Sequence, residues 1–219
     1  QLIACIWLML MCAMVWAKVP IPFWQHDTTY ACYGYFTTPY VSPPQTLPAG
    51  HWYIKGDGGL IWQEDKGIIA TPAALWYQKW MLQFSRAQLD TKGQLVLNLS
   101  GPSTLSSANF IMRFLSGVLH VKQQRAWIKD VSYAVAQQTQ HPIWGRAGEV
   151  SWHKRDWHMK NASYSGCDPE QPVWEWEASS IHIDEQANDI VMENGWLKLV
   201  GVPVFFWPYL KFPLKKKPR

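Results

Sequence analysis

Short runs in which apolar and polar residues alternate recur from His51 onward, and turn signals such as Ser100-Gly101-Pro102 separate them. Because side chains of a strand point alternately to its two faces, each apolar set shares one face. Roughly ten to twelve strands of this kind fit an antiparallel sandwich or open jelly roll. The chain is therefore expected to be all-β. The sets that carry this expectation are Trp80, Leu82 and Phe84; Leu95, Leu97 and Leu99; Phe110 and Met112; and Trp174 and Trp176.

The composition agrees with one β domain. The 219 residues are 48% hydrophobic and 16% charged, which suffices for a core. The 15 Trp, 9 Tyr and 8 Phe favour strands, where broad side chains pack on a pleated face. The net charge is +4, and the C-terminal tail supplies it through Lys215, Lys216, Lys217 and Arg219. The body before the tail is neutral, which argues against a nucleic-acid partner.

Two segments carry other local signals. Ala73 to Trp80 is the one window that could form an amphipathic helix. Gly56-Asp57-Gly58-Gly59 lacks the following Lys-Ser/Thr of a phosphate loop and is interpreted as a hairpin turn.

The first 17 residues are predicted to be a signal peptide. Leu2 to Ala17 is uncharged and almost wholly apolar, and it is too short for a comfortable membrane crossing of about 20 residues. An uncleaved anchor, a buried strand or helix, and lipidation at Cys12 are the alternatives. Residues 18–50 then form an extended lead-in, 51–200 the β domain, and 201–219 an aromatic strand with a basic tail.

Cys32 and Cys167 are the cysteines that would remain after cleavage. In an oxidising compartment they could close one large loop, or each could pair with a cysteine elsewhere. Two buried thiols would be the alternative in a reducing compartment.

Catalytic machinery is not evident in the sequence. His153 and His158 are five residues apart, so on one strand they point to opposite faces and do not suggest a metal site. Glu175 and Glu177 alternate with tryptophans and are expected on the wet face of a strand. We expect no enzyme activity, no metal and no cofactor.

The last sixty residues resemble a known family. Cys167-Asp168-Pro169, Trp174-Glu175-Trp176, Ala178 to Asp184 and Val202 to Pro213 follow, element for element, the end of the periplasmic N-terminal domain of the LPS-assembly protein LptD (OstA/Imp family). Trp144 to Glu149 looks like that family's Gly-Arg turn. The resemblance is strong over 143–219 and weak over 51–141. It implies an OstA-like β-taco, an open jelly roll, here without the family's C-terminal barrel.

In that family the aromatic strand is the hinge between the jelly roll and the barrel. The hinge residues here are Pro203, Phe205, Trp207, Pro208, Tyr209 and Pro213. Proline lacks a donor N–H, so it interrupts a continuous ladder and lets the chain change direction. A buried central strand over Phe205 to Leu210 is the rival interpretation. The resemblance also implies disulfides from Cys32 and Cys167 to a cysteine pair in the barrel.

The resemblance implies a lipopolysaccharide-binding and transfer module in the periplasm, at the inner face of the outer membrane. The partners would be lipopolysaccharide, a periplasmic bridge protein of the same β superfamily, and an outer-membrane barrel with its lipoprotein plug. The alternating apolar residues named above, Trp80 to Trp176, would line the lipid path. An edge within His51 to Gln63, including Ile54 and Leu60, would dock the bridge by strand addition. A soluble bridge component and a Trp-rich carbohydrate-binding sandwich are the alternatives.

Overall fold

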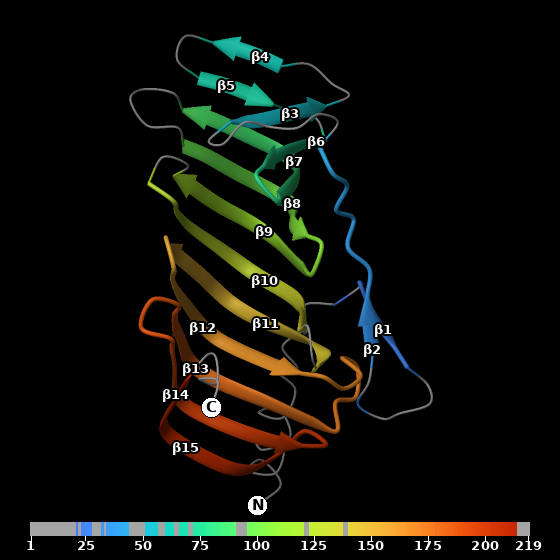
Figure 1. Cartoon of the computed structure of the whole chain (residues 1–219), viewed down its shortest axis with the longest axis vertical. Coiled ribbons are helices and arrows are strands. Elements are labelled where there is room, and N and C mark those ends of the chain that lie inside the picture. The colour runs from blue at the N-terminus through green and yellow to red at the C-terminus, as the bar shows by residue number, and fades with distance from the viewer. Residues whose placement is uncertain are drawn as a thin grey trace, which may run out of the picture.

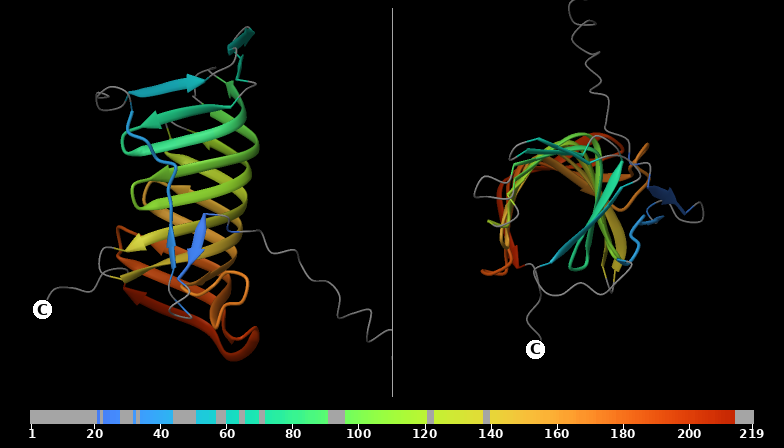
Figure 2. Two further views of the ribbon diagram at one scale, coloured as in Figure 1. Left: turned by 90° about the vertical axis from the view of Figure 1, so that its right-hand side faces the viewer. Right: turned by 90° about the horizontal axis from the view of Figure 1, so that it is seen from above.

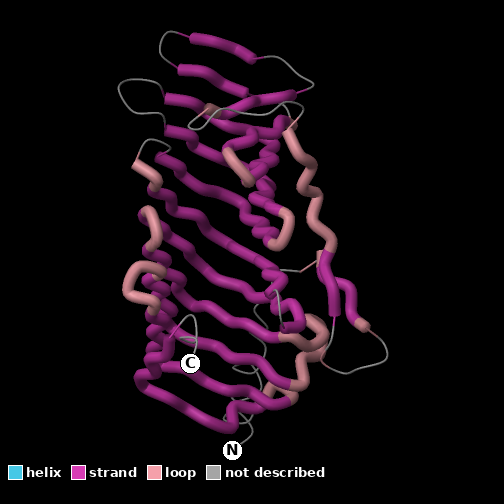
Figure 3. The backbone as a smooth tube through the Cα atoms, in the orientation of Figure 1, coloured by secondary structure: helices cyan, strands magenta, loops and turns pink. Residues whose placement is uncertain are grey.

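The computed structural model describes residues 21, 23–27, 32, 34–43, 51–56, 60–63, 66–69, 72–90, 96–120, 123–137 and 140–213. The predicted signal peptide, Leu95 and the basic tail lie outside the described residues. Within the described ranges the regular structure is all strand, as Figure 3 shows. The strands are β1 (Trp24–His26), β2 (Gly34–Phe36), β3 (Trp52–Gly56), β4 (Leu60–Gln63), β5 (Lys66–Ile69), β6 (Ala73–Tyr77), β7 (Trp80–Asp90), β8 (Val96–Ser107), β9 (Phe110–His120), β10 (Arg125–Gln137), β11 (Gln140–His153), β12 (Asp156–Ser165), β13 (Trp174–Asp184), β14 (Asp189–Leu199) and β15 (Val202–Pro213).

One antiparallel sheet contains all of these strands except β1 and β2. From β7 to β15 each strand pairs with its neighbours in sequence, so these strands form a series of consecutive hairpins, from β7 near the top of Figure 1 to β15 at the bottom. The sheet does not close: seen end-on, it is a curved, open trough (Figure 2, right). The predicted all-β open fold is confirmed.

The trough bends along a crease that crosses β7 to β15. At one position in each of these strands the regular pairing is interrupted, and these positions are neighbours from strand to strand. The crease residues are Ser85, Gly101 and Pro102, Leu115, Asp130, Gly148, Asn161, Ser179, Asn194 and Pro208.

Every second strand places a residue with positive φ on the crease. These residues are Gly101, Asp130, Asn161 and Asn194, with φ from 49° to 83°. Gly, Asn and Asp are the residues that tolerate this left-handed backbone conformation best. At the crease the inward face shifts by one residue, so the inward-facing residues on its two sides are three apart, as in Ile128 and Val131 or Met159 and Ala162.

The crease divides the sheet into two wings. The first wing holds the halves of β7 to β15 that lie on the side of β6 and β3, and the second holds the halves on the side of β5 and β4. The division shows in β7 itself, because its residues before the crease pair with β6 and those after it pair with β5. At that end of the trough the sheet therefore splits into two short arms, β6–β3 and β5–β4.

Two local predictions are wrong. Ala73 to Trp80 is not a helix but the β6–β7 hairpin, in which Leu75 pairs with Leu82. Gly56 to Gly59 does not close a hairpin, because β3 pairs with β6 and β4 pairs with β5. Residues 57–59 themselves lie outside the described residues. In the first case a local hairpin forms in place of the helix, and in the second the pairing of β3 with β6 overrides the turn signal.

The lead-in packs on the outside of the first wing. The β1–β2 hairpin buries Phe23 and Trp24 against Ile111, Ala134 and Trp144, on the outward faces of β9, β10 and β11 (Figures 1 and 2). Beyond β2 the chain runs along the sheet. There Thr38 Oγ1 donates to Ser107 O at 3.0 Å, and the Trp76 indole N–H donates to Val41 O at 2.8 Å.

Candidate functional site

The inner face of the first wing carries an apolar row that runs at right angles to the strands. Its members are cross-strand partners, so each lies beside the next. The row begins at Ile54 on β3, one open edge of the sheet, and ends at Phe205 on β15, the other. Its members are Ile54, Leu75, Leu82, Leu105, Met112, Tyr133, Gly145, Tyr164, Trp176, Leu197 and Phe205.

A second row faces it from the second wing. Trp152 and Trp157 lie at its centre with ring centroids 5.3 Å apart, in a stacked arrangement. Both rows contribute to the same hydrophobic core cluster, so the wings pack against each other. The members of the second row are Leu97, Leu119, Ala126, Trp152, Trp157, Ile183, Ile190 and Phe212.

Alanines line the bottom of the trough on three of its middle strands. Ala147, Ala162 and Ala178 are buried cross-strand neighbours next to the crease on β11, β12 and β13. On β7 and β9 the corresponding positions hold the buried Phe84 and Phe114, so this line of the interior is apolar along its length but not uniformly small.

The interior residues of the two rows carry no charge. Tyr133 and Tyr164 are the titratable members, and burial raises the pKa of each hydroxyl above its ordinary value. Tyr133 also donates its hydroxyl hydrogen to Ser163 O at 3.3 Å. Both tyrosines therefore stay neutral over the physiological pH range.

The residues predicted for the lipid path fall on this inner face in most cases. Leu82, Phe84, Leu97, Leu99 and Met112 are buried in the core cluster, and Phe110 and Trp176 pack against it. Trp80 and Trp174 are half-buried and contact Phe110 and Tyr164 edge-on. Leu95 is not described. Whether lipid travels along these residues stays a prediction.

The strands predicted to dock a partner are both edges. β3 pairs with β6 alone and β4 with β5 alone among the described strands, so each has one unpaired side. Ile54 and Leu60 thus lie at the same end of the trough but on opposite wings. An unpaired strand edge presents N–H and C=O groups that another strand can satisfy.

The predicted hinge strand, β15, is the edge strand at the other end. It pairs with β14 along its length. Its prolines lie where the pairing is irregular or ends: Pro203 beside a bulge, Pro208 at the crease and Pro213 at the end of the strand. Phe205 and Tyr209 are 48% and 57% exposed, so the rival interpretation of a buried central strand is wrong. On its inner side Trp207 contacts both Phe205 and Trp176, with ring centroids 3.6 and 5.0 Å away.

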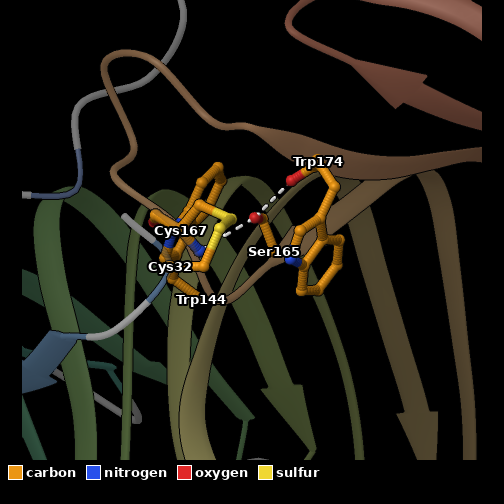
Figure 4. The surroundings of a disulfide bond; sticks show 5 residues. All are labelled: Cys32, Trp144, Ser165, Cys167 and Trp174. Carbon is orange, nitrogen blue, oxygen red and sulfur yellow. Dashed lines mark hydrogen bonds between the residues drawn. A yellow bond between two sulfur atoms is a disulfide. The ribbon is translucent and has the colours of Figure 1, made fainter. Parts of the chain in front are cut away.

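Cys32 and Cys167 form a disulfide that ties the lead-in to the loop after β12 (Figure 4). Trp144 donates its indole N–H to Cys167 O at 2.5 Å, and Cys167 N–H donates to Ser165 Oγ at 3.0 Å. The Ser165 hydroxyl in turn donates to Trp174 O at 2.5 Å. Of the pairings that the sequence left open, the structure shows the single large loop. The pairing to a barrel that the resemblance implies stays a prediction.

Glu175 does not lie in water, contrary to expectation. It is 4% exposed on the outer face of β13, and its carboxylate lies 3.7 Å from the guanidinium of Arg146. Burial lowers the pKa of Arg146, and the negative charge of Glu175 opposes that shift. The guanidinium also stacks over the Trp144 ring at 4.7 Å, so this pair supports the disulfide loop.

The structure also brings together residues that the sequence did not connect. His158 faces His182 on the next strand, and Asp156 lies beside both. His153, the partner considered from sequence, is not a member of this group. No described helix has the length and apolarity needed to cross a membrane.

Comparison with known proteins gives a consistent result for part of the chain. No family model matches. The chain is 30% identical over 103 residues to the LPS-assembly protein LptD of Legionella pneumophila strain Paris, a match that covers 45% of this chain and 12% of that protein. It is 33% identical over 70 residues to the LptD of Xanthomonas euvesicatoria (32% and 9% covered) and 43% identical over 59 residues to that of Bordetella avium (27% and 7% covered).

The aligned regions are a small fraction of these long relatives and about a quarter to a half of the chain described here. They carry the same name in three genera, and the open all-β fold agrees with the resemblance found in the sequence. Over its matched region, the chain is homologous to the N-terminal region of the LPS-assembly protein LptD.

Proposed function

We propose that this chain is a lipopolysaccharide-binding and transfer module of the cell envelope, located in the periplasm at the inner face of the outer membrane. The observation that carries the proposal is the apolar row of the first wing, which runs without a charged residue from the β3 edge to the β15 edge. The homology to LPS-assembly proteins supports the choice of lipid. The disulfide fits an oxidising compartment.

Acyl chains need such a face because water is a poor solvent for them. Exposing one buried CH₂ costs about 0.8 kcal/mol, so a lipid with several acyl chains requires continuous shielding on its way between membranes. An open sheet can shield the chains between its wings while the head group stays at the open seam. A closed barrel of the same composition would have to admit the polar head group as well.

The core cluster is packed in this structure, so acyl chains would have to replace contacts between the wings. Among the described strands, the wings are joined through the crease and not by a second set of strand pairs. Separating them breaks side-chain contacts but leaves the ladders of each wing intact. Chains of a lipid would then restore the apolar contacts that the wings lose, which keeps the energetic cost of opening low.

The two ends of the trough suit two different partners. At one end the β3 and β4 edges would receive a bridge protein of the same β superfamily, which would extend both the sheet and its inner apolar face. At the other end β15, with exposed Phe205, Phe206 and Tyr209, would lead toward an outer-membrane barrel and its lipoprotein plug. Aromatic residues suit a boundary where one side of the ring is apolar and the other is wet.

Site-specific photo-crosslinking in cells tests the lipid path. A photoreactive residue at Leu97, 3% exposed on the inner face, should capture lipopolysaccharide, whereas one at the adjacent, outward and exposed Asn98 should not. Phe110 on the first wing should behave like Leu97. Equal labelling at Leu97 and Asn98, or labelling at neither Leu97 nor Phe110, would refute the proposal.

Proline substitution tests the docking edge. Ile54→Pro and Leu60→Pro each remove a backbone N–H from an edge strand and should weaken binding of the bridge protein. Tyr209→Pro makes the same change on the opposite edge and should leave bridge binding unchanged. If Ile54→Pro and Leu60→Pro both bind as tightly as Tyr209→Pro, the bridge docks elsewhere.

A further inference from the structure

Three potential metal ligands converge on the outer face of the second wing. Asp156 and His158 lie two residues apart on β12, and His182 lies on β13 directly opposite His158. His182 Nε2 is 2.5 Å from Asp156 Oδ1, and His158 Nε2 is 3.8 Å from the same oxygen. The two imidazole rings stack, with centroids 4.1 Å apart and planes at 11°.

The convergence follows from strand geometry. Trp157, Ile181 and Ile183 point into the core, so the residues that alternate with them point outward. Antiparallel register then sets His158 beside His182, and the period of two adds Asp156 to the same patch. One candidate ligand atom from each side chain lies within 4.8 Å of the others.

We infer that Asp156, His158 and His182 form a binding site for a divalent transition-metal ion, with Zn²⁺ as the best fit. Two imidazole nitrogens and one carboxylate oxygen are ligands that Zn²⁺ accepts, whereas Ca²⁺ and Mg²⁺ prefer oxygen alone. Around a tetrahedral Zn²⁺, ligand atoms lie about 3.3 Å apart, given bonds of about 2.0–2.1 Å. Small rotations of half-exposed side chains bring the present separations to that value.

Two neighbouring charged groups, Asp184 and Lys160, are engaged elsewhere. Asp184, the cross-strand partner of Asp156, accepts the N–H groups of Gln186 and Ala187 at 2.8 Å each and so caps the β13–β14 turn. Lys160, next outward on β12, pairs with Glu149 at 2.9 Å. Lys160 is therefore not the partner of any of the three ligands. Solvent can supply the fourth ligand, because Asp156 and His158 are 49% and 51% exposed.

A metal held here would join β12 to β13 near the rim of the second wing. The site is independent of the proposed lipid path, because it lies on the opposite face of the sheet. Binding to the folded state alone should raise the unfolding temperature by about 5 °C or more when free Zn²⁺ exceeds the dissociation constant a hundredfold.

Calorimetric titration of the chelator-treated full chain with Zn²⁺ tests the inference. A Cys5→Ser/Cys12→Ser background removes the two thiols outside the Cys32–Cys167 disulfide, which could otherwise bind Zn²⁺. We expect one site per chain, a weakening of at least about tenfold in His158→Ala and in His182→Ala, and no binding of Mg²⁺. Co²⁺ at the same site should give visible absorption bands that both variants lose.

His120→Ala is the matched control. It removes a histidine that lies on the outer face of the same wing, three strands away, where its ring contacts Trp127. This variant should bind Zn²⁺ like the parent. Absence of Zn²⁺ binding in the parent, or equal affinity in the parent and the His158→Ala/His182→Ala double variant, would overturn the inference. A comparable loss of affinity in His120→Ala would overturn it too, since the effect would then not be specific to the three ligands.

Discussion

The crease should depend on residues that tolerate positive φ, and Asn161 offers the cleanest test. Its φ is 49°, its side chain is exposed, and the pairing between β11 and β12 and between β12 and β13 is interrupted there. Asn161→Val introduces a β-branched side chain into this backbone conformation. Left-handed backbone costs most L-residues roughly 1–2 kcal/mol, and exposure of the site means that core packing adds little.

The expected loss of unfolding free energy is therefore about 1.5 kcal/mol. For a urea m-value of about 3 kcal/mol/M, this moves the unfolding midpoint down by about 0.5 M without changing the slope. Urea titration followed by tryptophan fluorescence measures both quantities. Asn161→Gly is the matched control: it removes the same side chain but accepts positive φ, so it should unfold within a few tenths of a kcal/mol of the parent.

Equal midpoints for Asn161→Val and Asn161→Gly would refute this account of the crease. Asn194, at φ 50° on β14, is less clean because its side-chain amide donates to Ser179 Oγ at 3.0 Å. The Asn161→Val/Asn194→Val double variant should nonetheless lose about twice as much as the single variant, since the two sites lie on different strands.

Three further substitutions test contacts outside the two apolar rows. Arg146→Met should destabilise the fold by about 2–4 kcal/mol in urea titration, because it removes the cationic partner of the buried Glu175 carboxylate. Arg146→Met/Glu175→Gln should recover part of that loss, and no recovery would show that packing of Arg146 on Trp144 dominates. Cys167→Ser opens a loop of 135 residues, for which chain entropy gives a loss of up to about 5 kcal/mol, and it should match the reduced parent protein in the same titration. Backbone N–H donation, chiefly from Ala187, holds the pKa of Asp184 below its ordinary value. The ionised carboxylate therefore stabilises the fold above about pH 4, and this contribution is lost as the pH falls through the lowered pKa. Asp184→Asn should therefore be less stable than the parent at pH 6, and the difference should shrink toward pH 2; a constant difference would show that the charge is not the cause.

The sequence alone determined the strand character of the chain and the inward faces of many strands. Alternation such as Leu97 with Leu99, or Trp174 with Trp176, is a local property, because the two faces of a strand follow from backbone geometry. Edge strands at Ile54 and Leu60 were also anticipated from the resemblance. The crease left a local signal that could have been found, a step of three between buried residues, as from Ala178 to Ile181.

Only the tertiary structure decided which residues meet across strands. His158 and His182 are neighbours because β12 and β13 pair in one particular register, and a shift by one residue would send one of them into the core. Glu175 is buried beside Arg146 of the neighbouring part of the fold, although its alternation with tryptophan is that of an exposed residue. Cys32 reaches Cys167 because the lead-in folds back on β9, β10 and β11. Each of these contacts joins segments that are distant in sequence, and local periodicity determines the face of a side chain but not its neighbour on another strand.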